Sequence, residues 1–183
     1  MMPKTRPVAL LLGLCLSAGA FNHQALAAEA VFVAGRGHGV DMLSVGIRTP
    51  ELRTWNLDGG GKLSLLGEAT LSSWHSSDAG SQGNNLVDIG LTPMLRYFPA
   101  WATSRHFYLE AGAGVHGLSR TTMNSSRTFS TAFQFGEFIG GGVEFCPKGQ
   151  CSLGLRLQHV SNGGLKEPND GISFGQMIFG YRF

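Results

Sequence analysis

Leu153-Gly154-Leu155-Arg156-Leu157-Gln158-His159-Val160-Ser161 is a stretch in which apolar and polar side chains alternate. Successive side chains on an extended strand point to opposite faces, so the leucines share one face with His159 and Ser161. Arg156 and Gln158 lie on the other face. Leucines on one side and polar groups on the other are typical of a barrel strand with lipid outside and water inside. The lipid-facing stripe ends on a histidine and a serine, and polar groups are costly there unless they serve a function.

The same alternation recurs in six further segments, near residues 43–47, 63–72, 87–96, 107–116, 133–145 and 172–183. An extended segment near residues 31–36 brings the count to about eight strands. Eight strands form the smallest usual outer-membrane barrel, and side chains rather than an open pore fill its interior. Charged residues of both signs share one face of successive strands. We expect them to pair inside the barrel: Glu68, Asp88, Arg96, Glu110, Arg156 and Arg182.

Alternation alone also fits a soluble lipocalin-like barrel, in which the apolar face would point inward. Two features favour the membrane. Charges of both signs occupy one face, and the chain ends on Phe183 within an alternating strand, which resembles the terminal signature of bacterial outer-membrane barrels. The composition, with 27 glycines in 183 residues and 14% charged residues, also suits a closed membrane barrel. The sequence therefore predicts an all-β fold, an eight-stranded antiparallel transmembrane β-barrel of the bacterial outer membrane.

The N-terminus has the features of a signal peptide. Lys4 and Arg6 precede an apolar run over residues 8–20, and Ala25-Leu26-Ala27 supplies a small-x-small cleavage site. We expect residues 1–27 to be removed on export and residues 28–183 to form the barrel domain. No later stretch of about 18 apolar residues predicts a membrane-spanning helix.

Charge and cysteine content narrow the classes of partner. Without Lys4 and Arg6, the remaining 12 basic residues equal the 12 acidic ones, and no basic patch interleaved with aromatics predicts nucleic-acid binding. Cys146 and Cys151 flank a turn-like tetrapeptide, so a disulfide across a hairpin end is favoured over a metal site.

An even number of strands places both termini on the periplasmic side, with short turns there and longer loops outside. The disulfide turn is then periplasmic, and residues 162–171 form an extracellular loop. His159 and Ser161 lie at the outer end of their strand, level with the outer leaflet. We therefore expect a lipid substrate.

The segment His159-Val160-Ser161-Asn162-Gly163-Gly164-Leu165-Lys166-Glu167-Pro168-Asn169-Asp170-Gly171 resembles the active-site stretch of the outer-membrane lipid A 3-O-deacylase family (PagL). The upstream segment 107–112 also fits that family. The resemblance implies a serine esterase that removes the 3-O-linked hydroxyacyl chain of lipid A, or lipopolysaccharide. By the same resemblance Ser161 is the nucleophile and His159 the base.

The chemistry of these residue types agrees with the resemblance. A serine hydroxyl is a weak nucleophile until a neighbouring imidazole takes its proton, and same-face neighbours two apart on a strand are within side-chain reach. The developing oxyanion needs fixed donors. The candidates are backbone N–H groups of the Asn162-Gly163-Gly164 bend and the side chain of Asn169.

The orienting acid is where the sequence departs from the family. The family has a Glu twelve residues after the serine, and this chain has Ser173 there. Ser173 keeps the face parity and can accept a hydrogen bond, but it carries no charge. Outer-membrane phospholipase A uses a neutral Asn in that role. Glu137 is the second candidate, because it is the one carboxylate on the apolar parity of its strand; Asp170 and Glu167 in the loop rank lower.

Two other functions remain as alternatives. One is an outer-membrane phospholipase A-type esterase, although that family has longer, calcium-dependent dimeric chains. The other is a small non-catalytic structural or adhesin barrel, which would leave the thirteen-residue match to chance. The proposed ester hydrolysis requires no cofactor and no metal. Expected partners are lipid A and outer-membrane lipids, and the sequence leaves a homodimer open.

Overall fold

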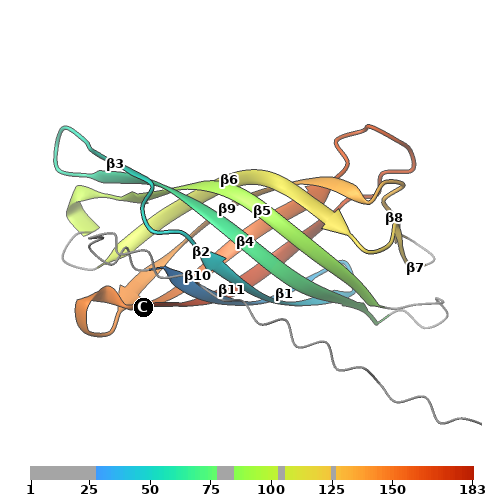
Figure 1. Ribbon diagram of the computed structural model, residues 1–183, viewed down its shortest axis with the longest axis horizontal. Helices are drawn as coiled ribbons and strands as arrows, with labels where there is room; N and C mark the ends of the chain where they lie inside the picture. Colours follow the sequence, from blue (N-terminus) through green and yellow to red (C-terminus); the bar gives the residue numbers. More distant parts are fainter. Residues whose placement is uncertain (1–27, 78–84, 103–105, 125–126) are drawn as a thin grey trace, which may run out of the picture.

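The computed structural model describes residues 28–77, 85–102, 106–124 and 127–183, and eight long antiparallel strands in them close into a barrel (Figure 1). The predicted fold class is confirmed. The expected signal segment, residues 1–27, lies outside the described residues. The long strands are β1 (Glu29–Gly37), β2 (Val40–Arg48), β4 (Lys62–Ser76), β5 (Asn85–Phe98), β6 (Phe107–Leu118), β9 (Phe133–Phe145), β10 (Cys151–Ser161) and β11 (Ile172–Arg182).

Hydrogen-bonded pairing runs β2-β1-β11-β10-β9-β6-β5-β4, and a β2–β4 pairing closes the ring. Three short strands lie outside the ring: β3 (Arg53–Asn56) pairs antiparallel with the start of β4, and β7 (Thr122–Asn124) pairs with β8 (Arg127–Thr128). None of the three was predicted. Two 3-10 turns, η1 (Ala100–Ala102) and η2 (Pro147–Gly149), complete the described elements. No helix in the described ranges is long and apolar enough to span a membrane.

The two ends of the barrel differ. At the end where β1 begins and β11 finishes, the Phe183 N–H donates to the Ala28 carbonyl at 3.0 Å; we call this the terminal end. The opposite end, the loop end, carries β7, β8 and the connection between β10 and β11 (Figure 1). We call that connection, residues 162–171, the active-site loop. The predicted disulfide between Cys146 and Cys151 is present in the turn between β9 and β10, at the terminal end.

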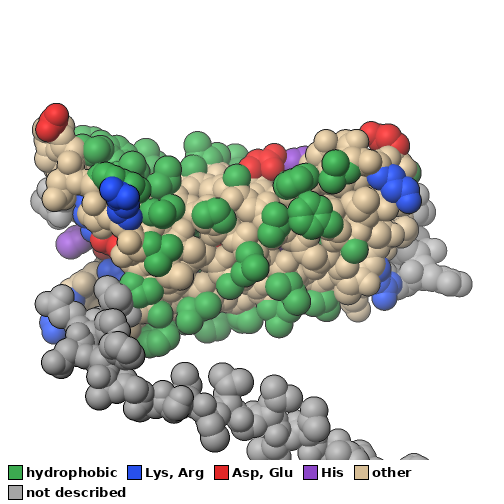
Figure 2. All heavy atoms as spheres, turned by 45° about the horizontal axis from the view of Figure 1, so that its top comes forward, with side chains coloured by type: hydrophobic (Ala, Val, Ile, Leu, Met, Phe, Trp, Pro, Cys, Tyr) green, Lys and Arg blue, Asp and Glu red, His purple; other side chains and the backbone are tan. Residues whose placement is uncertain are grey.

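The outer wall carries the apolar residues that the alternation assigned to it. Leu155 is 66% exposed, Leu157 68% and Ile139 66%. Figure 2 shows such side chains distributed over the barrel wall, with charges concentrated toward the two ends. Water would penalise this much exposed apolar surface, whereas lipid does not, so the wall is that of a membrane barrel.

Charged side chains fill the terminal half of the interior. They are buried and form one network, in which Arg48 Nε lies 2.7 Å from Glu68 Oε2 and Arg156 Nη1 2.8 Å from Glu68 Oε1. We call this the interior ion cluster: Glu29, Arg48, Glu68, Arg96, Glu110 and Arg156.

The expected set of interior charges was partly wrong. Asp88 does not join the cluster but pairs with His116 Nδ1 at 3.0 Å, further toward the loop end. Arg182 does join the paired charges, at their edge: it lies 2.8 Å from Glu144 near the terminal rim, and Glu144 Oε1 lies 3.7 Å from Arg96 Nη1. Glu29 and Arg48 belong to the cluster but were not predicted. Both lie at strand ends, Glu29 at the start of β1 and Arg48 at the end of β2, where alternation gives little signal.

The loop end of the interior is apolar rather than wet. Trp74 packs edge-on against Phe174 at 5.0 Å between ring centroids and against Phe129 at 6.1 Å. This group, which we call the apolar cap, consists of Val31, Val33, Val40, Met42, Trp74, Leu86, Leu118, Met123, Phe129, Val160, Ile172, Phe174 and Ile178. The apolar cap therefore replaces part of the expected polar interior at the loop end, where Ser76, Asn124 and Gln134 are also buried.

Candidate active site

Four residues singled out from the sequence meet on the outer wall near the loop end. His159 on β10 is the direct cross-strand partner of Glu137 on β9 and of Ser173 on β11. Side chains of such partners lie about 4.5–5.5 Å apart at Cβ. Ser161 lies two residues further along β10, on the same face. A bulge in β9 could have turned Glu137 into the barrel. Glu137 is instead exposed and in regular register with His159, so its side chain faces outward.

Ser173 holds the histidine ring. Its Oγ lies 2.9 Å from His159 Nδ1. When Nδ1 carries the proton and donates it to Ser173 Oγ, the lone pair is on Nε2, which makes Nε2 the basic nitrogen. The hydroxyl of Ser173 can thus select the ring tautomer that a general base needs.

Gly171 lies beside both His159 Nε2 and Ser161. A Cβ built on Gly171 would lie 3.2 Å from His159 Nε2 and 3.3 Å from Ser161 Cβ, so both groups border the same small space. Gly171 has φ +55°, a conformation that side chains disfavour. A larger residue here would strike the imidazole. Sequence reasoning missed this role, although a glycine directly before a strand was a usable signal.

The amides of the active-site loop are mostly committed to its own structure. The Asn162 N–H donates to Asn169 Oδ1 at 3.1 Å, and the Gly164 N–H donates to Asn162 Oδ1 at 2.9 Å. Asn162 Nδ2 donates to the carbonyls of Lys166 and Phe129. Asn162 and Gly164, two of the expected oxyanion donors, are therefore engaged in shaping the loop. Among the hydrogen bonds of the described residues, Gly163 N–H and Asn169 Nδ2 stay uncommitted.

The two loop carboxylates are also engaged. Glu167 Oε2 accepts from the Asn169 N–H at 2.9 Å, and Asp170 Oδ2 accepts from the Thr128 N–H at 2.6 Å. Both contacts hold backbone of the loop end, and neither is made to His159. Their low rank as orienting acids agrees with this geometry.

A hollow of about 600 Å³ opens beside the histidine, lined on the outer wall by Glu137, Ile139, Leu157, His159, Ser173 and Gly175. A second hollow, of about 820 Å³, shares Ile139, Leu157 and Gly175 and continues along the wall toward Leu155 and Met177. Because Gly175 has no side chain, the two are continuous past β11.

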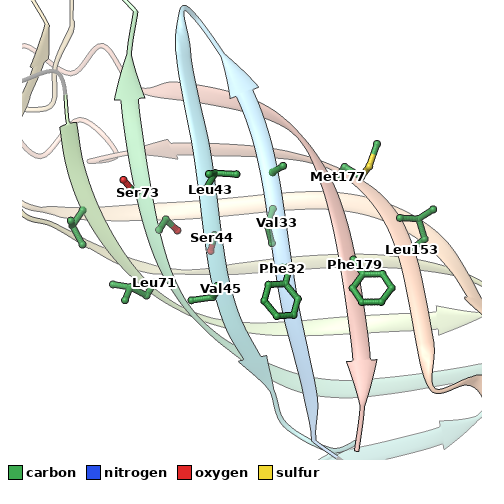
Figure 3. A pocket seen from close by; sticks show the side chains of 13 residues that line it. Phe32, Val33, Leu43, Ser44, Val45, Leu71, Ser73, Leu153, Met177 and Phe179 are labelled. Carbon is green, nitrogen blue, oxygen red and sulfur yellow. The ribbon is translucent and has the colours of Figure 1, made fainter. Parts of the chain in front are cut away.

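Similar hollows occur elsewhere on the wall. The one in Figure 3 lies between outward-pointing side chains such as Phe32, Leu43 and Phe179. Its lining carries no histidine or carboxylate. Within the described residues, no group of three or more His, Cys, Asp or Glu side chains could hold a metal ion.

The chain is similar to known proteins over most of its length. Residues 41–182 match the family model described as lipid A 3-O-deacylase (PagL). The lipid A deacylase PagL of Bordetella bronchiseptica is 31% identical over 183 residues, covering 100% of this chain and 98% of that protein. The lipid A deacylase PagL of Pseudomonas aeruginosa is 32% identical over 127 residues, 69% of each chain.

Two solved structures share the fold. A crystal structure of the outer membrane enzyme PagL superposes with a TM-score of 0.70 at 24% identity, covering 84% of this chain and 98% of that one. A de novo designed transmembrane β-barrel reaches a TM-score of 0.56 at 9% identity, covering 89% of this chain and 100% of the other. These likenesses concern the barrel fold.

Proposed function

Because this chain belongs to the lipid A 3-O-deacylase family, we propose that it hydrolyses the ester linking a 3-hydroxyacyl chain to lipid A, with Ser161 as nucleophile. The observation that carries the proposal is the placement of His159 Nε2 and Ser161 around Gly171, with Nδ1 held by Ser173. A histidine base that is held by a hydrogen bond to its other ring nitrogen, beside a serine, is the arrangement that serine esterases use.

The proposed reaction has two halves. His159 Nε2 takes the Ser161 proton as Oγ bonds to the ester carbonyl carbon, and the sugar oxygen then leaves with that proton. Water, deprotonated by the same nitrogen, next releases the 3-hydroxy fatty acid and restores Ser161. Gly163 N–H and Asn169 Nδ2 are the proposed donors to the oxyanion, while Asn162 and Gly164 keep the loop in shape.

The outer face that carries His159 and Ser161 also supports a location of the protein in the membrane. The proposed groups point out of the barrel near the loop end, so the substrate would approach within the membrane. We propose that the protein is exported, loses residues 1–27, and inserts into the outer membrane with its loop end outside. The ester would then be cleaved in the outer leaflet, where lipid A resides.

Mass spectrometry of lipids from cells that make the protein tests this function. We expect lipid A to lose the mass of one 3-hydroxyacyl chain, while phospholipids stay intact. Loss of acyl chains from phospholipids would instead favour a phospholipase. Unchanged lipids, from cells with the folded barrel in the membrane, would favour a structural barrel.

The orienting group can be assigned by two substitutions. Ser173→Ala removes the contact to Nδ1, and Glu137→Gln removes the negative charge beside His159. We propose that Ser173 fixes the ring and that Glu137 stabilises the imidazolium through space. Two unit charges about 6 Å apart interact by ~3 kcal/mol at an effective dielectric of 20.

We therefore expect each variant to lower kcat about 10- to 100-fold. The measurement is the rate of fatty-acid release from lipid A in micelles. A Glu137→Gln variant with the wild-type rate would remove Glu137 from the mechanism. Ser173→Glu, which restores the family's residue, should be at least as active as the wild type.

The hollow past Gly175 would guide the scissile acyl chain. Lipid tails are as apolar as the wall, so the hollow contributes alignment rather than a hydrophobic driving force. A Cβ at Gly175 would meet only the Arg36 carbonyl oxygen, at 3.9 Å, so a leucine there is compatible with folding. Gly175→Leu should lower kcat/KM for long acyl chains by about 10-fold or more.

Gly117→Leu is the matched control for Gly175→Leu. Gly117 is an outward-facing glycine on β6, and a Cβ there would meet only the Ile89 carbonyl oxygen, at 4.0 Å. We expect this variant to keep wild-type kcat/KM. Equal losses in the two variants, or none in either, would remove the guiding role.

A further inference from the structure

A short hairpin from a distant part of the chain contacts the active-site loop. Arg127 Nη1 donates to the carbonyl of Asp170 at 3.3 Å and to the carbonyl of Gly171. Thr128 and Asp170 exchange two bonds, Thr128 N–H to Asp170 Oδ2 at 2.6 Å and Asp170 N–H to Thr128 O at 3.3 Å. Phe129 O accepts from Asn162 Nδ2 at 2.8 Å. We call residues 127–129 the clasp.

The clasp is anchored in the barrel. Phe129 is fully buried and packs on Trp74, which in turn packs on Phe174 of β11. This packing fixes the backbone next to Phe129 to the apolar cap. The clasp can therefore act as a fixed support, since packed aromatic cores do not deform continuously.

The clasp holds the residue that borders both proposed reacting groups. The carbonyl of Gly171 accepts from Arg127, and the Cα of the same glycine faces His159 Nε2 and Ser161 Cβ. Gly171 has a positive φ, and glycine adopts positive and negative φ about equally readily, so the residue itself does little to keep this conformation. A displacement of about 1 Å at a catalytic pair can cost about 100-fold in rate.

We propose that Arg127 is a positioning residue for the His159–Ser161 pair, acting through the carbonyls of Asp170 and Gly171. It touches neither group itself. Arg127 is suited to this because Nη1 carries two N–H groups and donates to both carbonyls. This inference rests on the proposed function, because it concerns the rate of the same ester hydrolysis.

Arg127→Ala in the full-length barrel should lower kcat about 10- to 100-fold and leave KM within about twofold, because the hollow beside the histidine is untouched. Arg127→Lys, which keeps one donor, should recover part of the rate. Millimolar guanidinium added to Arg127→Ala should also restore activity. A residue needed only for folding would show neither recovery.

Asp170 provides an independent variant pair. Asp170→Asn keeps an oxygen acceptor for the Thr128 N–H and should stay within about threefold of the wild-type rate, whereas Asp170→Ala should fall about 10-fold. If Asp170 acted through its charge, Asn and Ala would be equally slow. This pair tests the Thr128 contact of the clasp, and Arg127→Lys still tests Arg127 itself if Arg127→Ala does not fold.

Arg53→Ala is the control, since Arg53 lies on β3 at the terminal end and stacks on Trp55. It should be unchanged. Wild-type kcat in folded Arg127→Ala would overturn the positioning role while leaving the proposed function intact, provided that Ser161→Ala is inactive. Full activity in Ser161→Ala would instead overturn the proposed function itself.

Discussion

Replacing Ser161 by alanine is expected to lower kcat for release of the 3-hydroxy fatty acid by about 10,000-fold or more. The variant lacks the oxygen that must bond to the ester carbonyl, and Ser161 borders the same space at Gly171 as His159 Nε2 does. Residues that act as a unit are not additive, so His159→Ala and the double variant should be about equally slow. Release of fatty acid from purified lipid A in micelles measures the effect.

Ser73→Ala is the matched control for Ser161→Ala. Ser73 faces outward as Ser161 does; it is exposed, lies on β4 and lines a hollow without a histidine. It should keep the wild-type rate. Folding of each variant can be checked by the faster migration of unheated barrels in SDS gels. A folded Ser161→Ala that retains more than a few per cent of the activity would contradict the nucleophile assignment.

Arg48→Met should cause the largest loss of stability. The Arg48 guanidinium is buried and lies 2.7 Å from Glu68, 3.5 Å from Glu29 and 3.5 Å from Glu110. The cluster holds three arginines and three glutamates, so removal of one arginine leaves an uncompensated buried negative charge. Breaking a buried ion pair in this way costs about 3–5 kcal/mol.

The free energy of unfolding can be measured by urea titration of the barrel in detergent micelles. The double variant Arg48→Met/Glu68→Gln restores neutrality and should recover part of the loss. Arg53→Ala, which removes an exposed arginine, should change the free energy by less than about 0.5 kcal/mol. If Arg48→Met matched that control, the cluster would not contribute to stability as we argue.

The barrel could be predicted from sequence because its two faces differ in chemistry over most of its length. Leu153 to Ser161 shows this directly, since one register places every leucine outside. The prediction fails near the loop end, where the pattern reverses. Trp74 points inward between the outward-facing Ser73 and His75, and Phe174 points inward between Ser173 and Gly175, so a rule that places apolar residues outside does not reveal the apolar cap.

The candidate site was predictable in part, for a related reason. Parity places His159 and Ser161 on one face, but the neighbours of His159 depend on the register of two hairpins. The η2 turn, with Cys146 and Lys148 at positive φ, sets which residue of β9 meets His159. The clasp was not predicted because it contacts a loop. Contacts of this kind follow no periodic sequence pattern, unlike the alternation of a strand.

The packed lumen determines how the substrate can arrive. Among the described residues, an interior hollow that Val33, Met42 and Arg156 help to line has a volume of only about 10 Å³, at most the space of a single water. Nothing as large as a glycolipid can thread the cylinder, so encounters take place by lateral diffusion in two dimensions. Turnover should then follow the mole fraction of lipid A at the surface rather than its bulk concentration, and inert amphiphile should slow the enzyme simply by spreading its substrate out.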